Sequence, residues 1–191
     1  MSYSLTNNPH MQKVEVTMTG LEKWHLLDHR LFYFVHRRAH SRLFYWWARL
    51  CSISGDGLIY VAAALGLWCF NLIGPLKLLA LGFTVERSVY FFAKPAFRRR
   101  RPAAALPQYT ALIQPADAFS FPSGHSSAAF LFATCVYLLD ANLSLLAFIW
   151  AANIAVSRVM LGVHFISDVV AGALIGIGIG ICCSRFVELS Q

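Results

Sequence analysis

Five long apolar blocks constrain the fold of this chain more than any other feature. They occupy residues 57–73, 76–85, 126–139, 143–156 and 168–184. Each block can be extended to about the 17–25 residues that a transmembrane helix needs. The 191-residue chain is 58% hydrophobic and 13% charged, whereas soluble domains average roughly 45–50% apolar and 25% charged residues. We therefore predict an all-α, polytopic membrane helical bundle of about five transmembrane helices.

The N-terminal region differs from these blocks. Residues 1–20 are polar and lack the apolar segment of a secretory signal peptide. Residues 21–53 combine aromatic side chains with arginines, a pattern typical of an interfacial amphipathic helix. The chain thus divides into a polar tail (1–20), an interfacial segment (21–53) with a helical break near His40–Ser41, and a transmembrane domain (54–185).

The net charge of +7 indicates an anionic partner. In so apolar a chain, anionic lipid head groups or a phosphorylated substrate fit this charge better than nucleic acid does. None of the five cysteines has the spacing of a metal site. The sequence contains no signature of an oligomeric state.

Three polar segments converge on one side of the membrane if the five blocks cross it in turn. The interfacial segment, the long connection at 94–121 and the junction at 157–164 share that side. The short turns near 74–75 and 140–142, and the C-terminus, lie on the other side. Long loops without structure of their own are often functional. We therefore expect the chemistry of this protein where these three segments meet, and they contain three clusters of polar residues.

The first cluster is KPAFRRRRP, which places Lys94 seven residues before Arg101 and puts Arg98, Arg99 and Arg100 between them. Guanidinium groups bind phosphate through paired hydrogen bonds, and lysine adds a point charge. Taken alone, the run could equally be a juxtamembrane basic segment that holds anionic lipid.

The second cluster, PSGH, opens the apolar block at 126–139. Ser123 occupies the position of a helix N-cap, and Gly124 lets a ligand approach the backbone closely. Free N–H groups at a helix N-terminus bind anions. His125 would lie beside such an anion and could transfer a proton to it, although an ordinary helix start explains the same residues.

The third cluster, SRVMLGVHFISD, contains His164 and Asp168 at a spacing of four, so both share one helix face. The carboxylate can hold one imidazole nitrogen and leave the other free to act as a nucleophile. Arg158 is six residues before His164, which is the wrong spacing for one face of a continuous helix. We predict a break at Gly162 that brings Arg158 and His164 together.

In combination, the three clusters describe phosphoryl transfer. Cations hold the phosphate, one histidine attacks phosphorus and the other protonates the leaving oxygen. The three motifs resemble the signature of the type 2 phosphatidic acid phosphatase (PAP2) family over roughly residues 50–185. The motifs that match are Lys94-x6-Arg101-Pro102, Pro122-Ser123-Gly124-His125 and Ser157-Arg158-x5-His164-x3-Asp168.

This resemblance implies a reaction without metal or other cofactor, through a phosphohistidine on His164. It implies that His125 is the general acid and that Asp168 orients His164. It also implies a phosphate site made of Lys94, Arg101, Ser123, Gly124 and Arg158. We expect further contacts to the substrate from Arg98, Arg99 and Arg100.

The substrate that we expect is a membrane lipid phosphate or diphosphate. The extra arginines favour a diphosphate, and undecaprenyl pyrophosphate is the leading choice. Phosphatidylglycerol phosphate, phosphatidate and lipid A are alternatives within the same reaction. A lipid phosphotransferase that uses the same phosphohistidine, and a non-catalytic membrane protein that binds anionic lipids, are alternatives from other classes.

The side of the membrane on which the site lies is predicted differently by two arguments. Lys and Arg concentrate on the side of the site, which would place that side in the cytoplasm. Many bacterial members of the family, however, work on the outer face. We expect an integral protein of a bacterial inner membrane whose site faces outward.

Overall fold

The computed structural model of the chain describes residues 20–115 and 117–189. Within these residues all regular elements are helices, and Arg100 and Phe119 form an isolated β-bridge. The all-α class predicted from the sequence is confirmed. The predicted polar tail lies outside the described residues, except for its last residue, Gly20.

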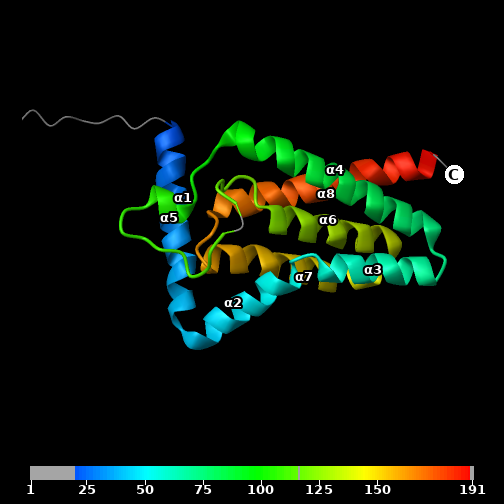
Figure 1. The fold of residues 1–191 in the computed structure, drawn as a ribbon, viewed down its shortest axis with the longest axis horizontal. Coiled ribbons are helices and arrows are strands. Elements are labelled where there is room, and N and C mark those ends of the chain that lie inside the picture. The colour runs from blue at the N-terminus through cyan, green and yellow to red at the C-terminus, as the bar shows by residue number, and fades with distance from the viewer. Residues whose placement is uncertain (1–19, 116, 190–191) are drawn as a thin grey trace, which may run out of the picture.

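The helices form a bundle that is crossed at one end by the first helix (Figure 1). Figure 1 shows α4, α6, α7 and α8 running side by side, and α1 across the end where α6 and α8 begin. In chain order the helical elements are α1 (Gly20–His36), the 3-10 helix η1 (Arg37–His40), α2 (Arg42–Ser54), α3 (Leu58–Cys69), α4 (Ile73–Phe97), α5 (Pro102–Ala105), α6 (Gly124–Leu139), α7 (Ala141–Met160) and α8 (Ile166–Leu189).

Helix α6 occupies the centre of the bundle and packs against α4, α7 and α8. Its contact with α8 is close because three glycines of α8 face it at intervals of four residues. A Cβ atom at Gly172 would lie 2.5 Å from Ser123 O, and one at Gly176 would lie 2.2 Å from Ser127 O. At Gly180 it would lie 2.8 Å from a methyl group of Thr134. Small residues at this spacing let two membrane helices approach to backbone contact.

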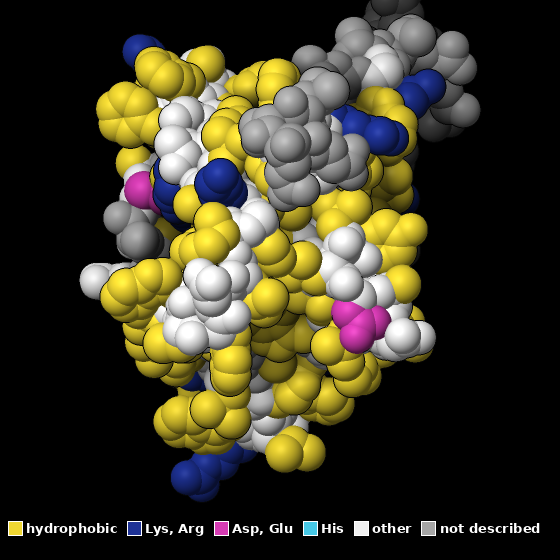
Figure 2. Space-filling view, turned by 90° about the vertical axis from the view of Figure 1, so that its right-hand side faces the viewer, with side chains coloured by type: hydrophobic (Ala, Val, Ile, Leu, Met, Phe, Trp, Pro, Cys, Tyr) yellow, Lys and Arg dark blue, Asp and Glu magenta, His cyan; other side chains and the backbone are white. Residues whose placement is uncertain are grey.

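The surface of the bundle is strongly apolar. Leu58 and Phe70, for example, are each 80% exposed, and the end of the bundle opposite α1 is covered mainly by hydrophobic side chains (Figure 2). In the described part of the chain, α7 and α8 are long and apolar enough to cross a membrane, and α2 with α3 would form a third span bent by 41°. These are the features of an integral membrane protein.

The count of five spans stays a prediction. Four of the five apolar blocks lie within helices, and the block at 57–73 contains α3 and the turn after it. However, α6 has only 16 residues and α3 only 12. Helix α4 has 25 residues and contains Lys77, Glu86, Arg87 and Lys94. The bend between α2 and α3 also means that α2, which we assigned to the interfacial segment, can be the first half of a broken span.

The predicted break near His40–Ser41 is present. Helix α1 continues into η1, and Ser41 has extended backbone angles before α2 begins at Arg42. A second expectation was less accurate, because α4 continues through Pro95 to Phe97, whereas we expected the polar connection to begin at residue 94. Lys94 is therefore held by a helix and not by a loop.

Candidate active site

A cavity of about 540 Å³ has its polar end near the starts of α6 and α8. Its wall includes residues from KPAFRRRRP, PSGH and SRVMLGVHFISD, so the structure brings these three motifs together at one cavity. Those residues are Lys94, Arg101, Gly124, His125, Arg158 and His164. Away from these polar groups the cavity continues between α3 and α4, where apolar side chains line it, among them Val61, Ala64, Leu79 and Phe83.

The turn between α7 and α8 brings Arg158 and His164 to the same cavity. Helix α7 ends at Met160, and Gly162 follows with a φ of +78°. A side chain at Gly162 would also collide with the Tyr109 hydroxyl, which lies 1.6 Å from the position of its Cβ. Only glycine fits this backbone conformation beside Tyr109. The break predicted at Gly162 is therefore present.

His164 is almost completely buried, and its two ring nitrogens face different partners. Nδ1 lies 3.6 Å from Asp168 Oδ2, too far for a hydrogen bond but within the range of an ionic contact. Nε2 lies 3.4 Å from Arg101 Nη1 and faces the cavity. Burial lowers the pKa of His164 to about 4, against the opposing effect of Asp168. Nε2 of the neutral ring is therefore available as a nucleophile.

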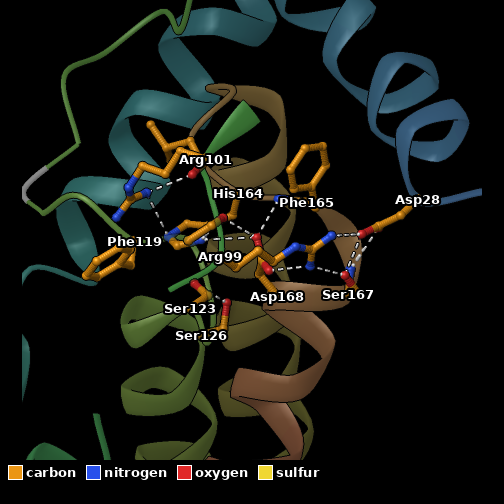
Figure 3. A network of polar contacts seen from close by, with 12 residues as sticks. Asp28, Arg99, Arg101, Phe119, Ser123, Ser126, His164, Phe165, Ser167 and Asp168 are labelled. Atoms are coloured by element: carbon orange, nitrogen blue, oxygen red, sulfur yellow. Dashed lines mark hydrogen bonds and ion pairs between the residues drawn. The ribbon is translucent and has the colours of Figure 1, made fainter. Parts of the chain in front are cut away.

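The carboxylate of Asp168 is fully buried behind His164 and is held at both oxygens. Oδ2 accepts hydrogen bonds from the Ser120 hydroxyl and from the backbone N–H of Phe165, the latter at 2.8 Å. Oδ1 accepts one from Arg99 Nη1 at 2.6 Å (Figure 3). Ser120 Oγ also lies 3.5 Å from His164 Nδ1, so it lies close to both residues.

Lys94 and Arg101 form a pair of cations around Asp117, a residue that the sequence analysis did not single out. Lys94 Nζ donates to both carboxylate oxygens of Asp117, at 2.7 and 2.8 Å, and Arg101 Nη2 donates to Oδ1 at 2.9 Å. Tyr90 donates its hydroxyl hydrogen to Oδ2. Burial alone would raise the pKa of Asp117, but hydrogen bonds from Lys94, Tyr90 and Arg101 keep that pKa far below its usual range.

Arg158 contributes the third cation. Its Nη1 donates to Ser52 Oγ of α2 at 2.5 Å. Its Nε is buried and has no hydrogen-bond partner in the described structure. A buried N–H group without a partner costs free energy unless a ligand accepts its hydrogen bond. The Nε atom thus indicates where an anion can bind.

His125 lies in the first turn of α6, and its Nε2 is 2.6 Å from Asp56 Oδ1, in the turn between α2 and α3. The neighbouring Gly124 lines the cavity, and a Cβ atom there would lie 2.5 Å from the ring of Tyr90. The glycine therefore lets Tyr90 reach Asp117 over the start of α6. Asp56, like Asp117, was missed by the sequence analysis.

Besides Asp168, which lies behind His164, four predicted residues do not line the cavity. Ser123 is the N-cap residue of α6 as expected, but its side chain makes no capping hydrogen bond. It is fully buried, and its N–H donates to Asp168 O at 3.1 Å. Arg98 and Arg100 are exposed, and Arg98 Nε donates to Pro95 O at 3.0 Å. Arg99 turns away from the cavity to the far side of Asp168.

Of the residues that the sequence analysis missed, only Asp56 has a sequence signal that could have revealed it. Asp56 lies in a Ser-Gly-Asp-Gly turn on the predicted site side, so its position relative to the membrane was readable. Asp117 and Ser120 lie in the long connection, where no periodicity indicates the direction of a side chain. Ser52 and Tyr90 lie in helices among apolar residues, and no local pattern marks them.

Comparisons with known proteins agree with this geometry. A family model described as the PAP2 superfamily matches residues 75–191, more than half of the chain. The chain belongs to the PAP2 superfamily. Among solved structures, this PAP2 protein is similar to Aquifex aeolicus LpxE, with 30% identity and a TM-score of 0.74. The match covers 83% of this chain and 95% of that one.

Two relatives are named as phosphatases. A probable lipid phosphate phosphatase beta of Arabidopsis thaliana is 30% identical over 139 residues, which cover 58% of this chain and 65% of the relative. Phosphatidylglycerophosphatase B of Bacillus subtilis is 33% identical over 111 residues, which cover 52% of each chain. This chain thus spans between half and two thirds of the length of these relatives.

Proposed function

We propose that this protein is a phosphatase of membrane lipid phosphates that acts through a phosphohistidine on His164. One observation carries the proposal. A neutral, buried imidazole nitrogen, His164 Nε2, faces a cavity whose polar end also contains Lys94, Arg101 and Arg158. A phosphate held by these cations would place phosphorus within reach of Nε2.

The reaction proceeds in two steps, formation of the phosphohistidine and its hydrolysis. In the first, Nε2 of His164 attacks phosphorus, the bond to the leaving oxygen breaks, and His125 gives that oxygen its proton. In the second, His125 takes a proton from water, the oxygen of that water attacks phosphorus, and the bond from phosphorus to Nε2 breaks. Inorganic phosphate leaves, and both histidines return to their starting states.

The cations stabilise the charge on the phosphoryl oxygens in both steps. Arg158 is the strongest candidate for the first contact, because its Nε lacks a partner. Lys94 and Arg101 already hold Asp117, which keeps their charged groups in fixed positions beside His164. With three cationic side chains from the chain itself, we expect the reaction to need no metal ion.

A lipid is the substrate class that fits the whole cavity. Beyond the polar end, its wall between α3 and α4 is formed by apolar side chains, which match a hydrocarbon chain. The names of the two phosphatase relatives support the same class. The site also lies at the end of the bundle, where the head group of a membrane lipid would be.

Undecaprenyl pyrophosphate is our leading substrate. The sequence analysis expected a diphosphate because of Arg98, Arg99 and Arg100, but none of these residues lines the cavity. Another cation, Arg87, does line the cavity next to Tyr90, with its guanidinium 4.5 Å from the ring centroid. Arg87 is paired with Glu86, yet its side chain is 53% exposed. We propose that it contacts a second phosphate.

We further propose that residues 54–185 form the catalytic unit, and that the protein lies in a bacterial inner membrane with its site facing outward. Alkaline phosphatase fusions at the described C-terminal end would test the orientation. That end lies opposite the site (Figure 1), so an outward-facing site requires an inactive, cytoplasmic fusion. An active fusion would reverse this orientation.

The deciding experiment is phosphate release by detergent-purified protein in the presence of EDTA. The panel holds undecaprenyl pyrophosphate, phosphatidylglycerol phosphate, phosphatidate and lipid A. We expect release that is abolished in His164→Ala and retained in His25→Ala, a histidine exposed on α1 outside the cavity. Turnover by His164→Ala would refute the phosphohistidine. Transfer of phosphate to an added alcohol, without release, would instead favour a phosphotransferase.

A further inference from the structure

Arg99 joins two carboxylates that lie far apart in the sequence. Its Nη1 donates to Asp168 Oδ1 at 2.6 Å, and its Nη2 donates to Asp28 Oδ2 at 2.5 Å (Figure 3). Asp28 belongs to α1 and is only 7% exposed, while Asp168 is fully buried at the start of α8. Arg99 therefore links the helix that crosses the end of the bundle to the carboxylate behind His164.

Asp28 also binds the start of α8 directly. Its Oδ1 accepts a hydrogen bond from the backbone N–H of Ser167 at 3.1 Å, and its Oδ2 accepts one from the Ser167 hydroxyl. Arg99 Nη1 donates to the same hydroxyl oxygen. A carboxylate at a helix N-terminus satisfies free N–H groups and is favoured by the helix dipole. Asp28 thus holds the residue that precedes Asp168.

A second contact holds the other end of the turn that carries His164. His36 Nδ1 lies 2.8 Å from Met160 O, at the last residue of α7. Between these two contacts, Phe32 is fully buried and packs edge-on against Phe165. Helix α1 therefore contacts the turn at Met160, at Phe165 and at Ser167, on both sides of the nucleophile.

We propose that Asp28 and Arg99 are positioning residues for His164, through which α1 holds the nucleophile turn and Arg99 controls the carboxylate of Asp168. This inference rests on the proposed function. It assigns Arg99 a role different from the substrate contact that the sequence led us to expect. It also makes α1, which lies outside the three motifs, a part of the catalytic apparatus.

The charge of Arg99 has a specific consequence for His164. A guanidinium bound to Oδ1 neutralises part of the charge of Asp168, so the carboxylate attracts a proton on His164 less strongly. The other charged groups that face the pair are Arg101 and Arg158, with Asp28 behind Arg99. His29 is the further titratable neighbour, and its ring stacks on Phe165.

The test compares four variants of the full-length protein in detergent: Arg99→Gln, Arg99→Lys, Asp28→Asn and Arg98→Gln. For each, kcat and KM are measured across pH on a lipid substrate that the wild type hydrolyses. Arg99→Gln should lose roughly 10–100-fold in kcat, the effect of a small misplacement of reacting groups, with little change in KM. The acid limb of its kcat/KM profile should move to higher pH, because His164 then becomes easier to protonate.

Arg99→Lys and Asp28→Asn separate charge from geometry. Lysine keeps the positive charge but cannot bridge two carboxylates as a planar guanidinium does, so kcat should fall while the acid limb stays in place. Asp28→Asn should also lower kcat without moving the acid limb to higher pH. Arg98→Gln removes an equal charge from the adjacent, exposed residue, and should leave the acid limb at the wild-type pH.

The results can overturn the inference without touching the proposed function. Wild-type turnover that His164→Ala abolishes establishes the phosphohistidine independently. Against that background, a raised KM with unchanged kcat and an unshifted acid limb in Arg99→Gln would make Arg99 a substrate contact. If Arg99→Gln does not fold, Asp28→Asn and Arg99→Lys decide, and wild-type kcat in both would refute the positioning role.

Discussion

Gly176 of α8 offers a direct test of how the bundle is held together. A Cβ atom added there would lie 2.2 Å from Ser127 O and 2.8 Å from Leu131 N. Both are backbone atoms of α6, so relief requires α6 and α8 to separate, because no side chain can rotate away. Forcing an extra methyl group into a packed contact costs about 1–3 kcal/mol. Alanine in place of glycine inside a helix offsets about 1 kcal/mol of that cost.

The matched control lies two residues away on the same helix. A Cβ atom at Gly178 has no neighbour within 4 Å, so Gly178→Ala should gain the helix propensity without the steric cost. The difference between the two variants isolates the contact. We expect Gly176→Ala to be less stable than Gly178→Ala by about 1–3 kcal/mol.

The free energy of unfolding can be measured in detergent by the fluorescence of the five tryptophans during denaturation. The contact also matters for the site, since α6 carries His125 and α8 carries Asp168. We therefore expect Gly176→Ala to reduce turnover as well, and Gly178→Ala to retain it. Equal stabilities of the two variants would show that α6 and α8 are not packed as closely as the structure has them.

Three further predictions concern the site itself. Asp56→Asn weakens a charge-assisted hydrogen bond to His125 that contributes about 1.5–3 kcal/mol. Because the Asp56 side chain is 54% exposed, we expect turnover to fall about tenfold, which corresponds to the low end of that range. The loss should be largest for alkyl leaving groups and small for p-nitrophenyl phosphate, and equal losses on both would argue against His125 as the acid. Burial lowers the pKa of His164 to about 4, so its ring stays neutral until the pH falls through that value. We therefore expect the acid limb of the kcat/KM profile near pH 4, whereas a limb near pH 6.5 would mean a solvated ring. Gly172→Ala should reduce turnover more than Gly178→Ala does, because a Cβ atom at Gly172 would lie 2.5 Å from Ser123 O, and a radioactive phosphate release assay compares the two.

Much of this protein could be predicted from its sequence because the relevant signals are local. Apolar blocks predict helices because backbone polar groups in lipid must be hydrogen-bonded within the segment. Successive blocks cross the membrane in alternating directions, which places each connection on one side. The residues Lys94, Arg101, His125, Arg158 and His164 were therefore expected at a common site, and all five line one cavity. A local signal was also missed. Gly172, Gly176 and Gly180 recur every four residues, a spacing that favours close helix packing.

The tertiary structure alone decided what each polar side chain contacts. Arg98, Arg99 and Arg100 are chemically identical neighbours in the sequence, yet they point to different partners. The reason is the backbone path, because Arg98 follows the end of α4 with a φ of +47° and Arg100 forms a backbone β-bridge with Phe119. Between them, Arg99 reaches Asp28 and Asp168, which are 71 and 69 residues away in the chain. Contacts over such separations depend on how whole helices pack, and no local pattern in the sequence encodes them.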